Sequence, residues 1–142
     1  MGKRGKPNDF PLSEHFRLYE FEDSNGMARV HPSVIRSLEE VRADLGALIG
    51  EEVEIVITGS TRTESENVEL AGKLGWIDRG GAVSRHSKHL PKFGGIAVDF
   101  YAKVKRTGIR IYQGVLGDAA RRHFRFVMDT YEDQHVHADN RP

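Results

Sequence analysis

Apolar residues recur along this chain with two different periods, and each period predicts one kind of element. From Pro32 to Leu48 they return every three or four residues, which is the spacing of one buried helix face, and Pro32 suits the first helical position. From Glu52 to Thr58 they alternate with polar residues, as in a half-buried strand. This pattern predicts a helix followed by a strand that ends at Gly59.

A second helix and a second strand are predicted further along the chain. Thr63 and Glu66 have the spacing of a capping box at a helix N-terminus, and Gly75 is placed to end that helix. From Ile96 to Tyr101 apolar residues again alternate with others. Because successive side chains of a strand point to opposite faces, Asp99 is expected on the face opposite to the apolar side chains.

The remaining stretches predict a short helix at Pro11–Phe21, a long loop at Trp76–Gly95 and a last helix near Gly117–His123. A terminal strand is expected to hold both His135 and His137. Helices and strands that do not alternate regularly favour an α+β fold, with a mainly antiparallel sheet flanked by helices.

Length and composition favour a single domain over residues 1–142, with residues 1–10 flexible. The 21 basic and 21 acidic residues balance, which argues against a nucleic-acid partner. No apolar run follows the basic N-terminus or is long enough to cross a bilayer, so we expect synthesis in the cytoplasm without a signal peptide or membrane insertion. Cysteine is absent, so a metal site must use His, Asp or Glu.

Histidines and a carboxylate lie in two segments that a fold could bring together. Strand geometry sends His135 and His137 to the same face. Upstream, His86 and His89 precede Asp99. A catalytic zinc ion takes three protein ligands and keeps a fourth position for water. The sequence therefore predicts a zinc site made of one upstream histidine, Asp99 and one downstream histidine.

At these residues the chain resembles the zinc D-alanyl-D-alanine carboxypeptidases and the phage L-alanyl-D-glutamate endolysins, whose fold is shared by the Hedgehog signalling domain. In that family a Ser-x-His-x-x-Gly-x-Ala-x-Asp stretch supplies two zinc ligands and a late histidine supplies the third. Gly95-x-Ala97-x-Asp99 and His137-x-Asp139 match these motifs.

Two further segments match the family in the right order. Leu12–Phe16 resembles its amino-terminal signature, and Ile57–Thr63 resembles its strand that ends in a substrate-binding arginine. The resemblance therefore implies a Hedgehog-type α+β fold. It also implies that Arg62 pairs with a carboxylate of a peptide substrate.

The resemblance implies that zinc is held by His89, Asp99 and His137. The family usually leaves six residues between its first histidine and the aspartate, whereas nine separate His89 from Asp99 and twelve separate His86 from it. Ser87–Leu90 looks more like the family's Ser-x-His-Leu, which favours His89 as the first ligand. His86 is the alternative ligand, because Ser84 precedes it by two positions.

The general base has several candidates. Many family members carry a carboxylate three residues before the last histidine, where this chain has Gln134. Asp133 is our expected base and Glu132 the alternative. His135 is expected to stabilise the oxyanion or to hold substrate. Asp139 is expected to orient a metal-bound histidine.

The resemblance implies a zinc-dependent peptidase, phage or prophage encoded, that cuts an amide bond in the peptide stem of bacterial peptidoglycan. Such a protein would reach the wall after holin-type release or as part of a phage particle. A second hypothesis is a catalytically silent, zinc-binding or structural module of a phage particle with the same fold. A third is a binder of anionic polymer through basic loop residues, namely Arg79, Arg85, Lys88 and Lys92.

Overall fold

In this computed structural model, the described residues are 8–23, 26–61, 64–81, 83, 88–89 and 95–142. The α-helices in these ranges are α1 (Pro32–Ile49), α2 (Glu64–Leu74) and α3 (Gln113–Arg121). The strands are β1 (Val53–Gly59), β2 (Ala97–Val104), β3 (Phe126–Met128) and β4 (Val136–Asp139). Two 3-10 helices, η1 (Leu18–Phe21) and η2 (Ile77–Arg79), complete the elements.

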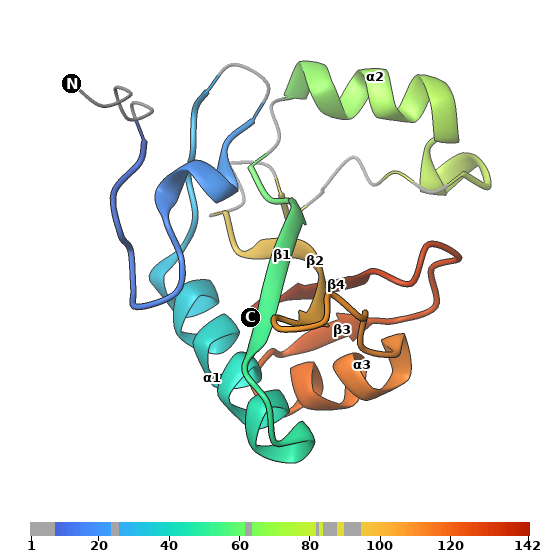
Figure 1. Cartoon of the computed structure of the whole chain (residues 1–142). Coiled ribbons are helices and arrows are strands. Elements are labelled where there is room, and N and C mark those ends of the chain that lie inside the picture. Colours follow the sequence, from blue (N-terminus) through green and yellow to red (C-terminus); the bar gives the residue numbers. More distant parts are fainter. Residues whose placement is uncertain (1–7, 24–25, 62–63, 82, 84–87, 90–94) are drawn as a thin grey trace.

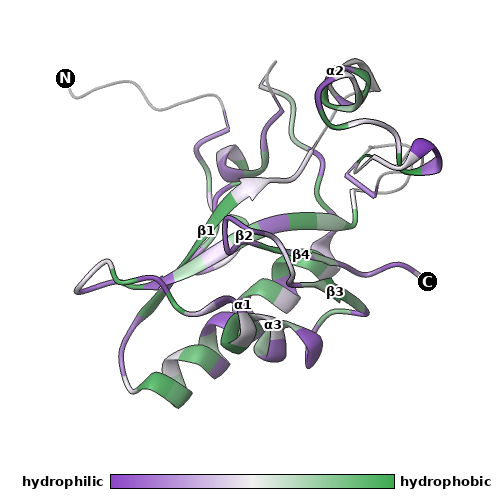
Figure 2. Cartoon of the chain, turned by 90° about the vertical axis from the view of Figure 1, so that its right-hand side faces the viewer, coloured by the Kyte–Doolittle hydropathy of each residue, from purple (hydrophilic) through white to green (hydrophobic). Residues whose placement is uncertain are grey.

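The strands form one sheet in the order β1-β2-β4-β3, and all its pairs are antiparallel. Helices α1 and α3 lie side by side against one face of this sheet, whereas α2 stands apart beyond the end of β1 (Figures 1 and 2). The expected α+β class with an antiparallel sheet is therefore confirmed. No helix in the described ranges combines the length and the apolar character that a membrane span needs.

Helix α1 supplies the main cover of the sheet. It begins after His31, whose side chain accepts a hydrogen bond from the Ser33 N–H, and it ends at Gly50, which adopts a left-handed conformation with φ of 78°. The predicted apolar stripe packs inward as far as Leu45, and its fully buried members are Val34, Leu38, Val41 and Leu45. Leu48, predicted at the end of this stripe, is 67% exposed because the last turn of the helix extends past the core. The helix thus fixes which face of the sheet becomes the core.

Strand β2 lies between β1 and β4, and its alternation divides the two faces of the sheet. Val98 and Phe100 are completely buried in the core. Asp99 points to the other face, and its side chain is 19% exposed. The predicted orientation of Asp99 is therefore confirmed. Its carboxylate lies on the sheet face that α1 and α3 do not cover.

Three sequence predictions for elements were wrong. His135 precedes β4 instead of lying in it, because that strand begins at Val136. The expected helix at Pro11–Phe21 is mostly a turn, because the N–H groups of Leu12 and Ser13 both donate to the Phe16 carbonyl, and only η1 is helical. Helix α3 begins at Gln113, four residues before the predicted start at Gly117. The short strand β3 was not predicted, because three residues are too few to show a period.

Helix α2 confirms the predicted element but not its predicted buried side. Ala71 is buried, whereas Val68 and Leu74 are 59% and 53% exposed. Thr63 lies outside the described residues, so the capping box stays a prediction. The described part of the expected loop Trp76–Gly95 contains η2.

We predict that Gly95→Ala destabilises the fold by about 2 kcal/mol or more. Gly95 has a positive φ of 61°, and a Cβ there would lie 2.3 Å from the Arg29 carbonyl oxygen. Gly72 in α2 is the matched control, because a Cβ there meets no atom within 4 Å. Gly72→Ala should leave the stability unchanged or raise it by up to about 1 kcal/mol. Urea unfolding measures both, and equal effects would contradict the account.

Candidate metal centre

The register of the sheet places Asp99 in the middle of the candidate site. Asp99 pairs with His137 on β4 and with Gly59 on β1, where the register shifts after Ile57. A Cβ on Gly59 would lie 3.2 Å from Asp99 Oδ2, closer than ordinary van der Waals contact. Glycine at this position therefore leaves room for the Asp99 carboxylate.

His89 reaches Asp99 from the loop that precedes β2. Its Nδ1 lies 2.8 Å from the Ser60 carbonyl oxygen, and a carbonyl can only accept, so the Nδ1–H must donate. Nε2, on the far side of the ring, lies 3.4 Å from Asp99 Oδ1. The ring is 4% exposed. The Ser60 contact thus turns Nε2 of His89 toward Asp99.

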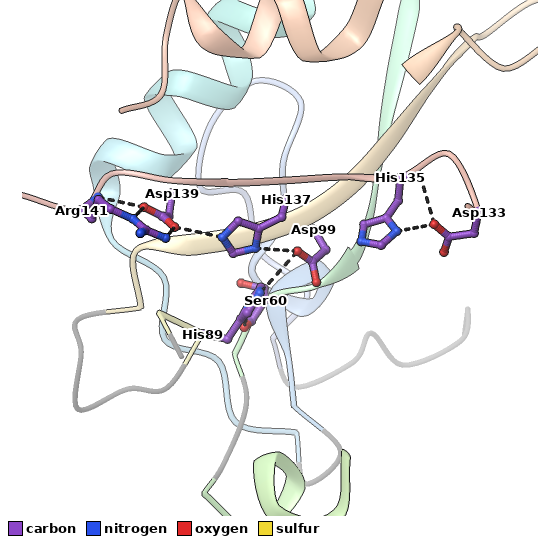
Figure 3. A network of polar contacts seen from close by, with 8 residues as sticks. All are labelled: Ser60, His89, Asp99, Asp133, His135, His137, Asp139 and Arg141. Atoms are coloured by element: carbon purple, nitrogen blue, oxygen red, sulfur yellow. Dashed lines mark hydrogen bonds and ion pairs between the residues drawn. The ribbon is translucent and has the colours of Figure 1, made fainter. Parts of the chain in front are cut away.

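His137 lies between two carboxylates. Its Nδ1 is 3.0 Å from Asp99 Oδ1, and its Nε2 is 2.9 Å from Oδ2 of the fully buried Asp139. Arg141 holds Asp139 in turn through Nε and Nη2, at 2.7 and 2.6 Å, and its guanidinium stacks 3.8 Å above the Phe126 ring. Figure 3 shows Arg141, Asp139, His137 and Asp99 following one another across the site.

The charges of this row stabilise one another. Burial lowers the pKa of His137, but its hydrogen bonds to Asp139 and Asp99 outweigh burial and raise the pKa to about 9. Burial raises the pKa of Asp99, but the charge of His89 and the hydrogen bond from His137 hold it well below its usual range. Burial likewise raises the pKa of Asp139, and Arg141 more than offsets it. In the metal-free protein at neutral pH, His137 is therefore a cation between two carboxylates.

The geometry of the three groups fits a metal ion. His89, Asp99 and His137 offer ligand atoms that all lie within 4.8 Å of one another. Ligands on a tetrahedral ion with bonds of about 2.0 Å are roughly 3.3 Å apart, close to the 3.0 and 3.4 Å that separate Asp99 Oδ1 from the two ring nitrogens. Two imidazoles and a carboxylate are also a donor set that zinc accepts. These residues could hold a metal ion.

A second acid–base pair lies beside this cluster. The Asp133 carboxylate contacts His135 Nδ1, and the hydrogen bond from His135 holds the pKa of Asp133 below its usual range. Tyr131 stacks on the His135 ring with centroids 3.9 Å apart, and Gln113 donates to the His135 carbonyl. Figure 3 shows His135 nearer to Asp99, with Asp133 beyond it. The imidazole is therefore fixed on the side of the cluster opposite to Asp139.

The structure does not place every predicted site residue. Arg62 and His86 lie outside the described residues, so their roles stay predictions. Glu132 is exposed, and the structure records no contact between it and the cluster among the described residues. Of the proposed basic loop, Arg85 and Lys92 also lie outside the described residues.

Sequence reasoning missed two residues of this network. Arg141 follows His137 and Asp139 at two-residue steps, and this spacing is the signal that could have indicated one shared strand face. Ser60 orients His89 through its backbone carbonyl, which no side-chain motif reveals. Among the described residues, the buried Ser60 Oγ has no hydrogen-bond partner. This hydroxyl is available to a water molecule or to a ligand group.

Comparisons with known proteins add little to this geometry. No protein-family model matches the chain, and none of the curated proteins searched matches its sequence. Among solved structures, the chain is similar to the L-Ala D-Glu endopeptidase ChiX of Serratia marcescens, with 19% identity over 77% of this chain and 80% of that chain and a TM-score of 0.46. At this identity and TM-score, the likeness establishes neither a common fold nor a common activity.

We predict that the metal-free protein loses stability as the pH rises through the pKa of His137. That pKa is about 9 in the folded state and about 6.5 in an unfolded chain, so the stabilisation is fully present below about pH 6.5 and is lost toward pH 9. The shift corresponds to about 3 kcal/mol of unfolding free energy.

Urea unfolding of the chelator-treated protein at several pH values measures this loss. His137→Gln should remove this part of the pH dependence, whereas His15→Gln, a change outside the cluster, should retain it. Parallel pH profiles for the wild type and His137→Gln would contradict the assignment.

Proposed function

We propose that this protein is a zinc-dependent peptidase that hydrolyses an amide bond in the peptide stem of bacterial peptidoglycan. The observation that carries the proposal is the convergence of His89, Asp99 and His137 from a loop and two strands. The motifs around Asp99 and His137 are those in which the chain resembles the D-alanyl-D-alanine carboxypeptidases and L-alanyl-D-glutamate endolysins. Phage or prophage origin and action at the cell wall belong to the same proposal.

In this proposal His89, Asp99 and His137 hold the zinc ion. A bound zinc ion acidifies a coordinated water and polarises a carbonyl group. Asp139 keeps the Nε2–H of His137 engaged, which leaves Nδ1 directed at the site. Arg141 fixes the Asp139 carboxylate through two parallel hydrogen bonds, so that the ring cannot turn away.

In this proposal, Asp133 and His135 together carry out proton transfer. The Asp133 carboxylate accepts the Nδ1–H of His135, which leaves Nε2 as the nitrogen that can take or give a proton. Figure 3 supports this division, because His135 lies between Asp133 and Asp99. Asp133 then acts through His135. An exposed carboxylate with a lowered pKa is itself a weak base. Arg62 stays our proposed partner for a substrate carboxylate.

The alternative is a catalytically silent module that binds zinc or serves in a phage particle. Two features of the sequence favour it. Gln134 occupies the position where many of the peptidases have a carboxylate, and nine residues separate His89 from Asp99 instead of six. Zinc binding without turnover of any wall fragment would support this alternative.

We predict that the zinc-supplied wild type cleaves a soluble stem peptide that contains both the L-Ala-D-Glu and D-Ala-D-Ala bonds. Mass spectrometry of the products identifies the bond. His137→Ala should lower the rate about 1000-fold or more, because it removes a metal ligand. His15→Ala, a histidine outside the cluster, should keep the wild-type rate. Circular dichroism checks that both variants are folded. Equal hydrolysis by the wild type and His137→Ala would contradict the zinc mechanism.

A further inference from the structure

Arg110 lies on the same face of the sheet as the candidate metal centre. Strand β4 begins at Val136, opposite Phe100, and further along β2 its place is taken by residues 109–111, where Arg110 pairs with Lys103. Directly opposite residues of an antiparallel pair project to the same face, and so do residues two apart along one strand. Asp99, Tyr101 and Lys103 alternate on this face. Arg110 therefore lies on the same face as the candidate metal centre. Its partner Lys103 is four residues along β2 from Asp99, the partner of His137.

The guanidinium of Arg110 leans back toward the metal centre. Its Cζ lies 3.9 Å above the centre of the Tyr101 ring, and its Nη2 donates to the Asp133 carbonyl oxygen over 3.2 Å. Tyr101 is two residues from Asp99, a distance of roughly 7 Å along a strand. The stacking contact and the hydrogen bond thus hold the Arg110 guanidinium beside Tyr101, two residues along β2 from Asp99.

Among the described residues, Arg110 makes no direct ion pair, unlike six other arginines. Six described arginines bind a carboxylate directly: Arg17, Arg42, Arg106, Arg121, Arg122 and Arg141. Arg110 is exposed, and its direct contacts in the described ranges are a carbonyl oxygen and a ring, while the Asp133 carboxylate interacts with its charge from a greater distance. The nearby Asp133 carboxylate contacts His135 instead. Most of the five N–H donors of Arg110 therefore remain available.

We propose that Arg110, positioned by Tyr101, forms a subsite for a carboxylate of a bound peptide, about two residues from the metal centre. An extended peptide advances about 3.3 Å per residue. If such a peptide lies along β2 with its reacting bond at Asp99, the residue two positions from that bond lies beside Arg110. A planar guanidinium binds a carboxylate through two parallel hydrogen bonds. This proposal rests on the proposed function, because it takes this face to be the one that binds peptide.

The test is equilibrium binding of a stem peptide to the chelator-treated full chain by calorimetry, where turnover does not consume the peptide. Two analogues carry a carboxamide in place of one carboxylate, either at the C-terminus or at the free carboxylate of D-Glu. At least one amidation should weaken binding to the wild type about 10-fold, and the one whose effect is lost in Arg110→Gln identifies the carboxylate that Arg110 binds. Arg110→Gln should bind the acid and that amide equally. Arg110→Lys, which keeps the charge but loses the planar fork, should show an intermediate preference.

Arg36→Gln is the matched control, because Arg36 is exposed on α1, which packs against the opposite face. It should keep the full preference for the acid, and thermal unfolding checks that each variant is folded. The proposal is overturned if the wild type binds acid and amides equally, if it binds no stem peptide, or if Arg110→Gln keeps the preference. Failure of hydrolysis alone would overturn the proposed function but not the Arg110 subsite, because the binding preference is measured without turnover.

Discussion

The contact between Asp99 and His137 is the interaction on which the rest of the site depends. It joins the two inner strands, β2 and β4, on the face that the helices leave uncovered. A buried ion pair is costly to desolvate and becomes tolerable only when hydrogen bonds satisfy both partners. Here His89 adds a second contact to Asp99, and the pair Asp139 and Arg141 satisfies the far side of His137. The result is a row of alternating charges, in which a metal ion would replace the proton on His137 Nδ1.

The core explains why this row is held in place. Strand β2 has a neighbour on both sides, and its inward side chains Val98 and Phe100 are completely buried beneath α1 and α3. Slipping the register by one residue would expose these side chains and bury Asp99 in the core, so packing fixes the face of Asp99. The opposite face then carries the candidate metal ligand Asp99 near one end of β2 and the Tyr101–Arg110 stack further along. One strand therefore aligns a candidate metal centre with a candidate substrate-binding surface.

The sequence predicted those parts of the molecule that a short-range period encodes. The buried stripe of α1 and the alternation around Asp99 follow from periods of 3.6 or 2 residues. The period-2 pattern extended the last strand too far, because His135 precedes β4. The roles of Arg141 and Ser60 depend on tertiary contacts, one of them through a backbone carbonyl, which no period shows. The choice between His89 and His86 depends on a loop whose path no local pattern specifies, and the structure describes only His89 of the two.

The most direct test of this account is the zinc content of the purified full chain, measured by elemental analysis after zinc is supplied and excess metal is removed. The account predicts about one zinc per chain in the wild type and in His86→Ala, and loss of the metal in His89→Ala, Asp99→Ala and His137→Ala, with each variant still folded. Absence of bound zinc from the wild type, or its retention in His137→Ala, would contradict the assignment of His89, Asp99 and His137 as a metal centre.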